Sequence, residues 1–289
     1  MTAYQPLISV TLPNYNYGRF LAQSFDSILT QTYENLEILF TDDGSTDDSI
    51  EIARRYAAKD SRIKAVYFEK NQGAMAAHGN AWNRVTGEII YQFSSDDYIT
   101  DADFFRCGVK LMTAYPRAAG FFGLADIIVI ETGLKSFQMG KAEPSGYITP
   151  EAFLHGFLTQ EFFVPGISSM WRKRHIDAVG EYDKRLGPQA DYFINHVLPA
   201  RAGVVYAPAV VAHARTSSQT KSYSASASLE DELKRLALFS SKMRSHTARS
   251  GASEADWNCW RNNRANYLIT KYGAACREPT SQGSLADLG

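Results

Sequence analysis

Two pairs of adjacent carboxylates each follow an apolar stretch that has the pattern of a buried strand. Asp42-Asp43 follows residues 36–41, and Asp96-Asp97 comes shortly after residues 89–93. Neighbouring carboxylates repel each other, and burying them without compensation is costly. Ligands of open α/β sheets bind beyond the carboxyl ends of the strands. The spacing therefore predicts a site for a divalent cation, Mn²⁺ or Mg²⁺, and for the phosphate oxygens that accompany such an ion.

The elements that must hold these carboxylates alternate between strand and helix patterns. Apolar runs predict strands at 7–12, 36–41, 63–68, 88–93 and 120–130. Helix-like spacing of apolar residues predicts helices at 20–29, 50–58, 73–85 and 101–115. Repeated units of this kind favour a largely parallel, helix-covered sheet with right-handed connections.

The pattern changes after Glu131. We expect a loop over 135–146 and a helix that starts with Thr149 as N-cap and Pro150 in its first turn. Further on, the pattern predicts a short helix at 191–198, a strand at 204–213, a mobile Ser/Thr-rich segment at 215–228 and an amphipathic helix through 229–243. Another helix carries Trp257 and Trp260; core packing is the default expectation for these, and a membrane or partner interface is the alternative.

Composition sets only broad limits. The chain has 289 residues, 45% of them hydrophobic, and a formal net charge of −1, which gives no reason to expect nucleic acid as a partner. Its three cysteines, Cys107, Cys259 and Cys276, are far apart, so we expect unpaired thiols. The sequence shows neither a signal peptide nor an apolar run of about 20 residues. We therefore expect a cytoplasmic protein, with peripheral contact at the inner face of a membrane left open.

Four short motifs resemble, in the same order, those of family 2 glycosyltransferases. They are Pro13-Asn14-Tyr15-Asn16, Gln31-Thr32-Tyr33, Asp42-Asp43-Gly44-Ser45-Thr46-Asp47 and Asn71-Gln72-Gly73. The combination is specific, although each motif alone is weak. The resemblance implies a GT-A fold, which is an α/β nucleotide-binding domain with a mostly parallel central sheet flanked by helices, here followed by a C-terminal helical extension.

The resemblance also implies a division of the chain. Residues 1–222 would form the GT-A domain, with a nucleotide-sugar-binding half at 1–115 and an acceptor half at 116–222. Residues 223–277 would form the helical extension, which resembles no family, and residues 278–289 would be a disordered tail.

Several side chains are expected to contact the nucleotide by comparison with the family. These are Thr11, Pro13, Tyr15, Asp42, Asp43, Lys70, His78 and Asp96. His78 stands where relatives commonly carry an arginine, so it either replaces that contact or is a plain helix-surface histidine. The resemblance further implies metal ligation by Asp97, with His213 as a second ligand, and phosphate binding by Arg215. Which of Asp96 and Asp97 binds the metal is left open.

The expected general base is Asp191. Gln189-Ala190-Asp191-Tyr192, downstream of a Gly-x-Tyr-Asp stretch that ends at Asp183, resembles the family's Glu-Asp signature, with Ala190 in place of the glutamate. An inverting transfer needs one carboxylate to accept the proton of the acceptor hydroxyl. An N-cap role is the alternative for Asp191, and Asp183 is expected to be structural.

The resemblance thus implies a metal-dependent inverting hexosyltransferase-type enzyme. It would move a sugar from a UDP- or dTDP-sugar to a glycan or lipid-linked acceptor in bacterial surface-glycan assembly, and could form homo-oligomers through its C-terminal helices. One alternative is a non-catalytic nucleotide-sugar-binding or scaffold protein, since Ser94 and Ala190 replace carboxylates. A sugar-1-phosphate nucleotidyltransferase is the other, but it would need a basic Gly-rich loop where Pro13-Asn14-Tyr15-Asn16 stands.

Overall fold

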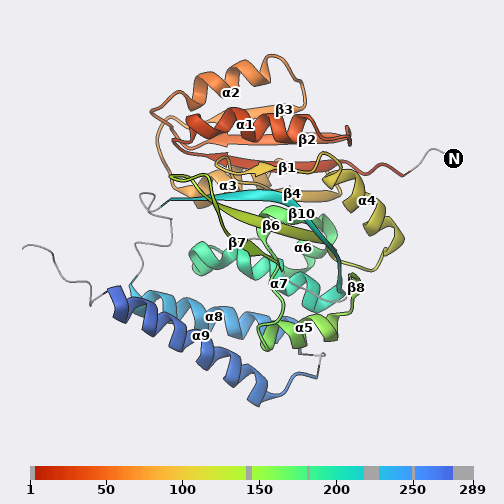
Figure 1. Ribbon diagram of the computed structural model, residues 1–289, viewed down its shortest axis with the longest axis vertical. Coiled ribbons are helices and arrows are strands. Elements are labelled where there is room, and N and C mark those ends of the chain that lie inside the picture. The colour runs from red at the N-terminus through yellow and green to blue at the C-terminus, as the bar shows by residue number, and fades with distance from the viewer. Residues whose placement is uncertain (1–3, 141–144, 181–182, 218–227, 249–250, 276–289) are drawn as a thin grey trace, which may run out of the picture.

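The structure, a computed structural model, describes residues 4–140, 145–180, 183–217, 228–248 and 251–275. Its centre is a ten-stranded sheet with the order β3-β2-β1-β4-β9-β6-β10-β5, in which β7 pairs with β6 and β8 with β10 (Figure 1). The strands are β1 (Ile8–Asn14), β2 (Leu36–Asp42), β3 (Ile63–Tyr67), β4 (Ile89–Gln92), β5 (Tyr98–Ile99), β6 (Gly120–Val129), β7 (Lys135–Met139), β8 (Gly146–Ile148), β9 (Ser169–Arg172) and β10 (Val204–Thr216).

Helices cover both faces of this sheet. They are α1 (Gly18–Leu29), α2 (Ser49–Ala57), α3 (Ala74–Trp82), α4 (Phe104–Ala114), α5 (Pro150–Leu158), α6 (Lys173–Val179), α7 (Ala190–Ala202), α8 (Leu229–His246) and α9 (Glu254–Ala275), with 3-10 turns η1 (Gly166–Ser168) and η2 (Lys184–Gln189). Alternate residues of a strand enter opposite cores: Ile89 and Tyr91 pack with α1 and α4, whereas Ile90 packs with α5 and α7. This period of two is what a sheet buried on both faces requires.

Strand direction decides which loops meet. β1 to β4 are mutually parallel, and β9 is antiparallel to both β4 and β6, so β6 runs in the same direction as β4. β10 is parallel to β6. The six strands β1, β2, β3, β4, β6 and β10 therefore end at one edge, and the expected mostly parallel sheet is confirmed, with antiparallel pairs added by β5, β7, β8 and β9.

The sequence predictions for the first half agree with the structure to within a few residues. Thr149 is the N-cap of α5 and accepts a hydrogen bond of 3.2 Å from the Ala152 N–H, as expected. The loop expected at 135–146 is wrong over its first part, because β7 extends the sheet as the partner of β6. β10 also continues to Thr216, since Arg215 and Thr216 pair with β6. The remaining Ser/Thr-rich residues from 218 to 227, and the tail from 276 onward, lie outside the described residues.

The C-terminal helices pack on the sheet domain. Figure 1 shows α8 and α9 (blue) beside α7 and α5, on the side of the molecule away from β2 and β3. Trp257 and Trp260 are 4% and 1% exposed and join one core cluster with Phe157 and Phe239, which confirms core packing. Cys107 and Cys259 are free thiols, as expected, and Cys276 lies outside the described residues. Over the part of the chain that the structure describes, no helix has the length and apolarity needed to cross a membrane.

Candidate active site

The predicted site residues converge on one edge of the sheet. The loops after β1, β2, β3 and β4 leave from this edge because the four strands are parallel. α7 ends at the opposite edge, where Gly203 connects it to the start of β10, so the first turn of α7, which contains Asp191, lies toward the first edge. The loops after β2 and β4, the end of β10 and the start of α7 therefore lie at the same edge of the sheet (Figure 1).

The loops after β1 and β2 are locked to each other. Asn14 Nδ2 donates to Asp42 Oδ2 at 2.8 Å, and the Ser45 backbone N–H and hydroxyl donate to the two Asp42 oxygens at 2.8 and 2.7 Å. Asn16, in a left-handed conformation with φ of 57°, accepts a 2.8 Å hydrogen bond from the Thr46 N–H. Asp42 is 0% exposed. Its carboxylate thus holds the two loops together, and its predicted contact with a nucleotide has no support from these contacts.

Asp43 holds the next loop. Its two carboxylate oxygens accept hydrogen bonds from the backbone N–H groups of Gln72 and Gly73, at 2.7 and 2.8 Å. Gly44 has a φ of +73°, and a Cβ there would lie 2.6 Å from the Lys70 carbonyl carbon, so only glycine fits between these segments. Lys70 itself is exposed beside this loop. The Asn71-Gln72-Gly73 motif is therefore positioned by Asp43.

The other nucleotide candidates differ in their exposure. Tyr15 is 42% exposed and Pro13 is half-buried at the end of β1. Thr11 is buried, and its hydroxyl has no hydrogen-bond partner among the described residues. His78 lies on α3, where burial lowers its pKa to about 4, so its imidazole is neutral near pH 7.

Asp96 and Asp97 have different surroundings. Asp97 is 5% exposed, and its Oδ1 accepts a 2.8 Å hydrogen bond from the Arg215 backbone N–H. Asp96 is half-buried and hydrogen-bonded to Tyr17. Burial raises the pKa of both carboxyls, and the Asp96 charge raises the pKa of Asp97 further. The loop is anchored from α1, because the buried Ser24 hydroxyl contacts the carbonyl oxygens of Ser95 and Asp97 at 2.8 and 2.6 Å.

The Arg215 guanidinium lies against this loop. It lies 4.6 Å from the Phe20 ring centroid and 4.5 Å from that of Tyr98, and it donates to the Asp96 carbonyl oxygen and to Gln23 Oε1. Arg215 therefore lies beside the carboxylate pair. Its present contacts hold β10, α1 and the loop after β4 together.

His213 belongs to a row of polar residues that crosses four strands. In register, Tyr98 on β5, His213 on β10, Asp126 on β6 and Gln138 on β7 follow one another. His213 Nδ1 lies 2.7 Å from the Tyr98 hydroxyl, and Nε2 lies 3.8 Å from Asp126 Oδ2. Asp126 Oδ1 also pairs with Lys135 Nζ at 2.8 Å. Both ring nitrogens of His213 thus face protein groups, which gives no support to its predicted metal ligation.

Asp191 is an accessible carboxylate at the start of α7. The helix begins at Ala190 with Gln189 as its N-cap, so the alternative N-cap role for Asp191 is wrong. Its side chain is solvent-exposed, and Oδ1 accepts a 2.6 Å hydrogen bond from the Tyr192 N–H. The surrounding protein nevertheless raises its pKa by desolvation. A carboxylate that is reachable and more basic than usual is suited to accept a proton.

Asp96 and Asp97 can hold a hard cation only when oxygen atoms of a bound substrate and water complete its coordination shell. Within the described ranges, no three His, Cys, Asp or Glu side chains gather as a metal-binding cluster. Mg²⁺ and Mn²⁺ sites that act on phosphates commonly use one or two carboxylates, with substrate oxygens and water completing the shell. The half-buried Asp96 and its neighbour Asp97 satisfy that smaller requirement.

Residues 9–151 match a family model described as glycosyl transferase family 2. Residues 9–151 therefore belong to this family. The matched region of this family 2 glycosyltransferase contains both carboxylate pairs and all four motifs, and it ends before Asp191.

Curated relatives match about a third of the chain. An uncharacterized glycosyltransferase of Haemophilus influenzae is 42% identical over 96 residues, which cover 33% of this chain and 38% of that protein. The putative teichuronic acid biosynthesis glycosyltransferase TuaG of Bacillus subtilis is 37% identical over 97 residues, covering 34% of this chain and 38% of that protein. The chain thus matches less than two thirds of the length of these relatives.

Solved structures share the fold along almost the whole chain. S. aureus TarS 1–349 in complex with UDP-GlcNAc has a TM-score of 0.68 at 15% identity, covering 94% of this chain and 76% of that one. The mannosyltransferase PcManGT of Pyrobaculum calidifontis, in complex with GDP-Man and Mn²⁺, has a TM-score of 0.56 at 17% identity, covering 98% and 77%. At these identities the likeness concerns the fold, and the expected GT-A fold is confirmed.

The sequence did not predict several residues that lie at this edge of the sheet. Tyr17, Phe20 and Gln23 contact the Asp96 loop or Arg215 from α1, and Asp126 faces His213. The only sequence signal was their position near the end of a strand or the start of a helix. Their partners lie more than 70 residues away, so periodicity does not identify them.

Proposed function

We propose that the chain transfers a sugar, with inversion, from a nucleoside diphosphate-sugar to the hydroxyl group of a glycan or lipid-linked acceptor. The observation that carries this proposal is the accessible carboxylate of Asp191 at the same sheet edge as Asp96 and the family 2 loops. A donor bound over the strand ends would present its anomeric carbon toward the start of α7.

The reaction needs one base and one stabilised leaving group. Asp191 takes the proton of the acceptor hydroxyl while that oxygen forms a bond to the anomeric carbon. The bond from the anomeric carbon to the diphosphate oxygen breaks on the opposite face of the sugar, and its electron pair leaves with the nucleoside diphosphate. Because desolvation raises the pKa of Asp191, its carboxylate is a stronger base than an ordinary aspartate.

Mn²⁺ or Mg²⁺, when bound, would neutralise negative charge on the diphosphate. We assign Asp96 as the residue that holds it, because Asp97 is nearly fully buried and already accepts the Arg215 N–H. The assignment expected from the sequence, metal on Asp97, is the alternative. His213 and Arg215 then support the loop through Tyr98 and the Asp96 carbonyl oxygen.

We assign the nucleotide contacts to exposed side chains at the same edge of the sheet. Tyr15 and Lys70 are exposed on neighbouring loops, and Pro13 is half-buried between them. Asp42 and Asp43 act indirectly, by fixing these loops. A uridine or thymidine base is favoured, since the TarS structures with UDP and UDP-GlcNAc share the fold. The relationship to TuaG supports a role in bacterial surface-glycan assembly.

Donor turnover by the Asp191→Asn variant tests the proposal. Purified protein with Mn²⁺ and a panel of UDP-, dTDP- and GDP-sugars is first screened by thermal shift, since a bound donor raises the Tm. With acceptor extracts added, we expect nucleoside diphosphate release and a product of inverted anomeric configuration by NMR. Asp191→Asn should keep donor affinity and lose about 10²–10⁴-fold in transfer. A protein that binds UDP but cleaves no donor would instead support the non-catalytic binding or scaffold alternative.

A further inference from the structure

The segment that leads to Asp191 is short and irregular. η2 runs from Lys184 to Gln189 as a 3-10 turn and contains Gly187 at φ 53° and ψ −129°, which is not helical. A stretch of this kind has few hydrogen bonds of its own, and 3-10 runs of this length are uncommon. The position of Asp191 therefore depends on what the segment packs against.

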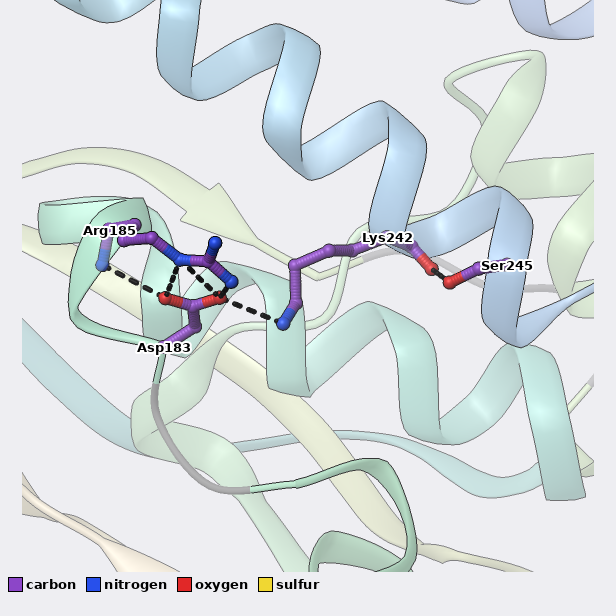
Figure 2. A network of polar contacts seen from close by, with 4 residues as sticks. All are labelled: Asp183, Arg185, Lys242 and Ser245. Carbon is purple, nitrogen blue, oxygen red and sulfur yellow. Dashed lines mark hydrogen bonds and ion pairs between the residues drawn. The ribbon is translucent and has the colours of Figure 1, made fainter.

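Helix α8 of the C-terminal extension holds this segment at both ends. At the first end, Asp183 Oδ2 pairs with Lys242 Nζ at 2.9 Å and with Arg185 Nη2 at 2.7 Å, as Figure 2 shows. These hydrogen bonds from Arg185 and Lys242 lower the pKa of Asp183. Asp183 is thus structural, as the sequence predicted.

At the second end, Gln189 Nε2 donates a hydrogen bond of 2.8 Å to Glu232 Oε2. Glu232 is 6% exposed, and its other oxygen pairs with Arg235 Nη1 at 2.6 Å. A buried carboxylate is retained at low energetic cost only when it is paired and hydrogen-bonded. Gln189 and Arg235 supply those partners, and Gln189 lies two residues before Asp191.

The contacting residues lie on one face of α8. Glu232, Arg235, Phe239 and Lys242 are spaced by three or four residues, which places them along one side of a helix. Arg235 Nε would lie 3.1 Å from a Cβ at Gly187, and the Phe239 ring is 5.4 Å from that of Tyr192, the residue after Asp191. One helix face therefore contacts the segment before the base and the residue after it.

We propose that α8 positions the catalytic base, with Glu232 acting through Gln189 as the positioning residue. This inference rests on the proposed function of Asp191. The extension then belongs to the catalytic apparatus, although it lies beyond the region that matches the family. A misplacement of about 1 Å at a reacting group costs about 10²-fold in rate, so loss of this contact should reduce turnover without affecting the donor loops at the strand ends.

A variant that replaces the Gln189–Glu232 hydrogen bond with two carboxylates, and a double variant that restores the bond, test the proposal in the full chain. Gln189→Glu places a second carboxylate against Glu232, and we expect kcat to fall about 10- to 100-fold with the KM for the donor unchanged. Gln189→Glu combined with Glu232→Gln exchanges the donor and acceptor of the hydrogen bond, and should restore kcat to within about threefold of wild type. Glu230→Gln and Lys234→Met alter an exposed ion pair of the same helix and should leave kcat unchanged.

Two readouts separate positioning from simple stabilisation. All rates are measured well below the Tm of each variant, and amide hydrogen exchange is followed over residues 183–192. We expect faster exchange there in Gln189→Glu and recovery in the double variant. A Gln189→Glu protein with a lower Tm but wild-type kcat would overturn the inference, as would unchanged exchange. If wild type itself transfers no sugar, the proposed function fails, and the exchange experiment still decides whether α8 controls the segment.

Discussion

The backbone N–H of Arg215 donates a 2.8 Å hydrogen bond to Asp97 Oδ1, which fastens the end of β10 to the loop after β4. These residues are 118 positions apart in the chain. Asp97 is buried and already hydrogen-bonded to the protein, whereas the neighbouring Asp96 is only half-buried. The contact separates two adjacent aspartates that the sequence alone left equivalent.

This separation predicts different effects of two matched substitutions. Asp96→Asn should abolish the rise in Tm that Mn²⁺ gives in the presence of UDP, because the carboxylate assigned to the cation is lost. Asp97→Asn keeps an oxygen that can accept the Arg215 N–H, so most of the Mn²⁺-dependent rise should remain. Thermal shift with and without Mn²⁺ measures both. The opposite pattern would place the cation on Asp97.

The raised pKa of Asp191 predicts an acidic limb in the activity profile. Transfer requires the ionised carboxylate, so kcat should increase with pH through an apparent pKa above the ordinary aspartate value of 3.8. Asp191→Asn should lose the part of the limb that Asp191 contributes, and any limb that remains is assigned to Asp96 and Asp97, whose pKa values burial also raises. A wild-type profile that is flat down to pH 4 would argue against Asp191 as the base.

The same shift has a consequence for stability. Because the folded pKa lies above the unfolded value, the folded state binds this proton more tightly. The folded protein therefore becomes less stable as the pH rises from the pKa of the unfolded state to the pKa of the folded state. It remains less stable at neutral pH. Because the Asp191 side chain is exposed, solvent reduces this effect, so Asp191→Asn should have a Tm only slightly above that of wild type at pH 7, and the difference should vanish near pH 3. Calorimetry at the two pH values checks this.

Gly44 and Gly133 form a matched pair for testing the loop after β2. Both have positive φ, +73° and +67°, but a Cβ at Gly44 would meet the Lys70 backbone at 2.6 Å, whereas Gly133 has nothing within 4 Å. Gly133→Ala should cost about 1–2 kcal/mol for the left-handed conformation alone. Gly44→Ala should cost more and should also weaken UDP binding, because the loop has to move. Equal effects in denaturant titrations would contradict this.

Glu37, which lies far from the site, should make a pH-dependent contribution to the stability of the fold. It is 3% exposed and accepts hydrogen bonds from Ser9 at 2.6 Å, Lys64 at 2.5 Å and the Thr86 N–H at 2.9 Å. Burial alone would raise its pKa, but these hydrogen bonds outweigh burial and lower it to about 2. The stability that results is present above the unfolded value of 4.5 and is lost as pH falls toward 2.

Glu37→Gln should therefore destabilise the protein at pH 7 by about 3 kcal/mol, the free energy that corresponds to the lowered pKa. The difference from wild type should shrink as the pH approaches 2. Denaturant unfolding at several pH values measures it, with Glu230→Gln on an exposed pair as the control that should change little.

The sequence by itself determined the order of the strands and helices in the first half, except for the two-residue strand β5, and it placed the carboxylate pairs where β2 ends and in the loop after β4. Local periodicity and turn residues suffice for this, because the face of a strand and the start of a helix depend on neighbours along the chain. The match between the motifs and family 2 added the fold and the expected base. The strand character of residues 135–139 was missed, because the exposed β7 has no buried face of its own to create an apolar pattern.

Only the tertiary structure decided what each carboxylate contacts. Asp42 and Asp43 are occupied by Asn14, Ser45 and the backbone of Gln72 and Gly73, so they hold loops together. Asp191 remains accessible and is approached by α8 through Gln189. A hydrogen-bond partner depends on which distant segments meet at a strand end, and that is set by the packing of the whole sheet.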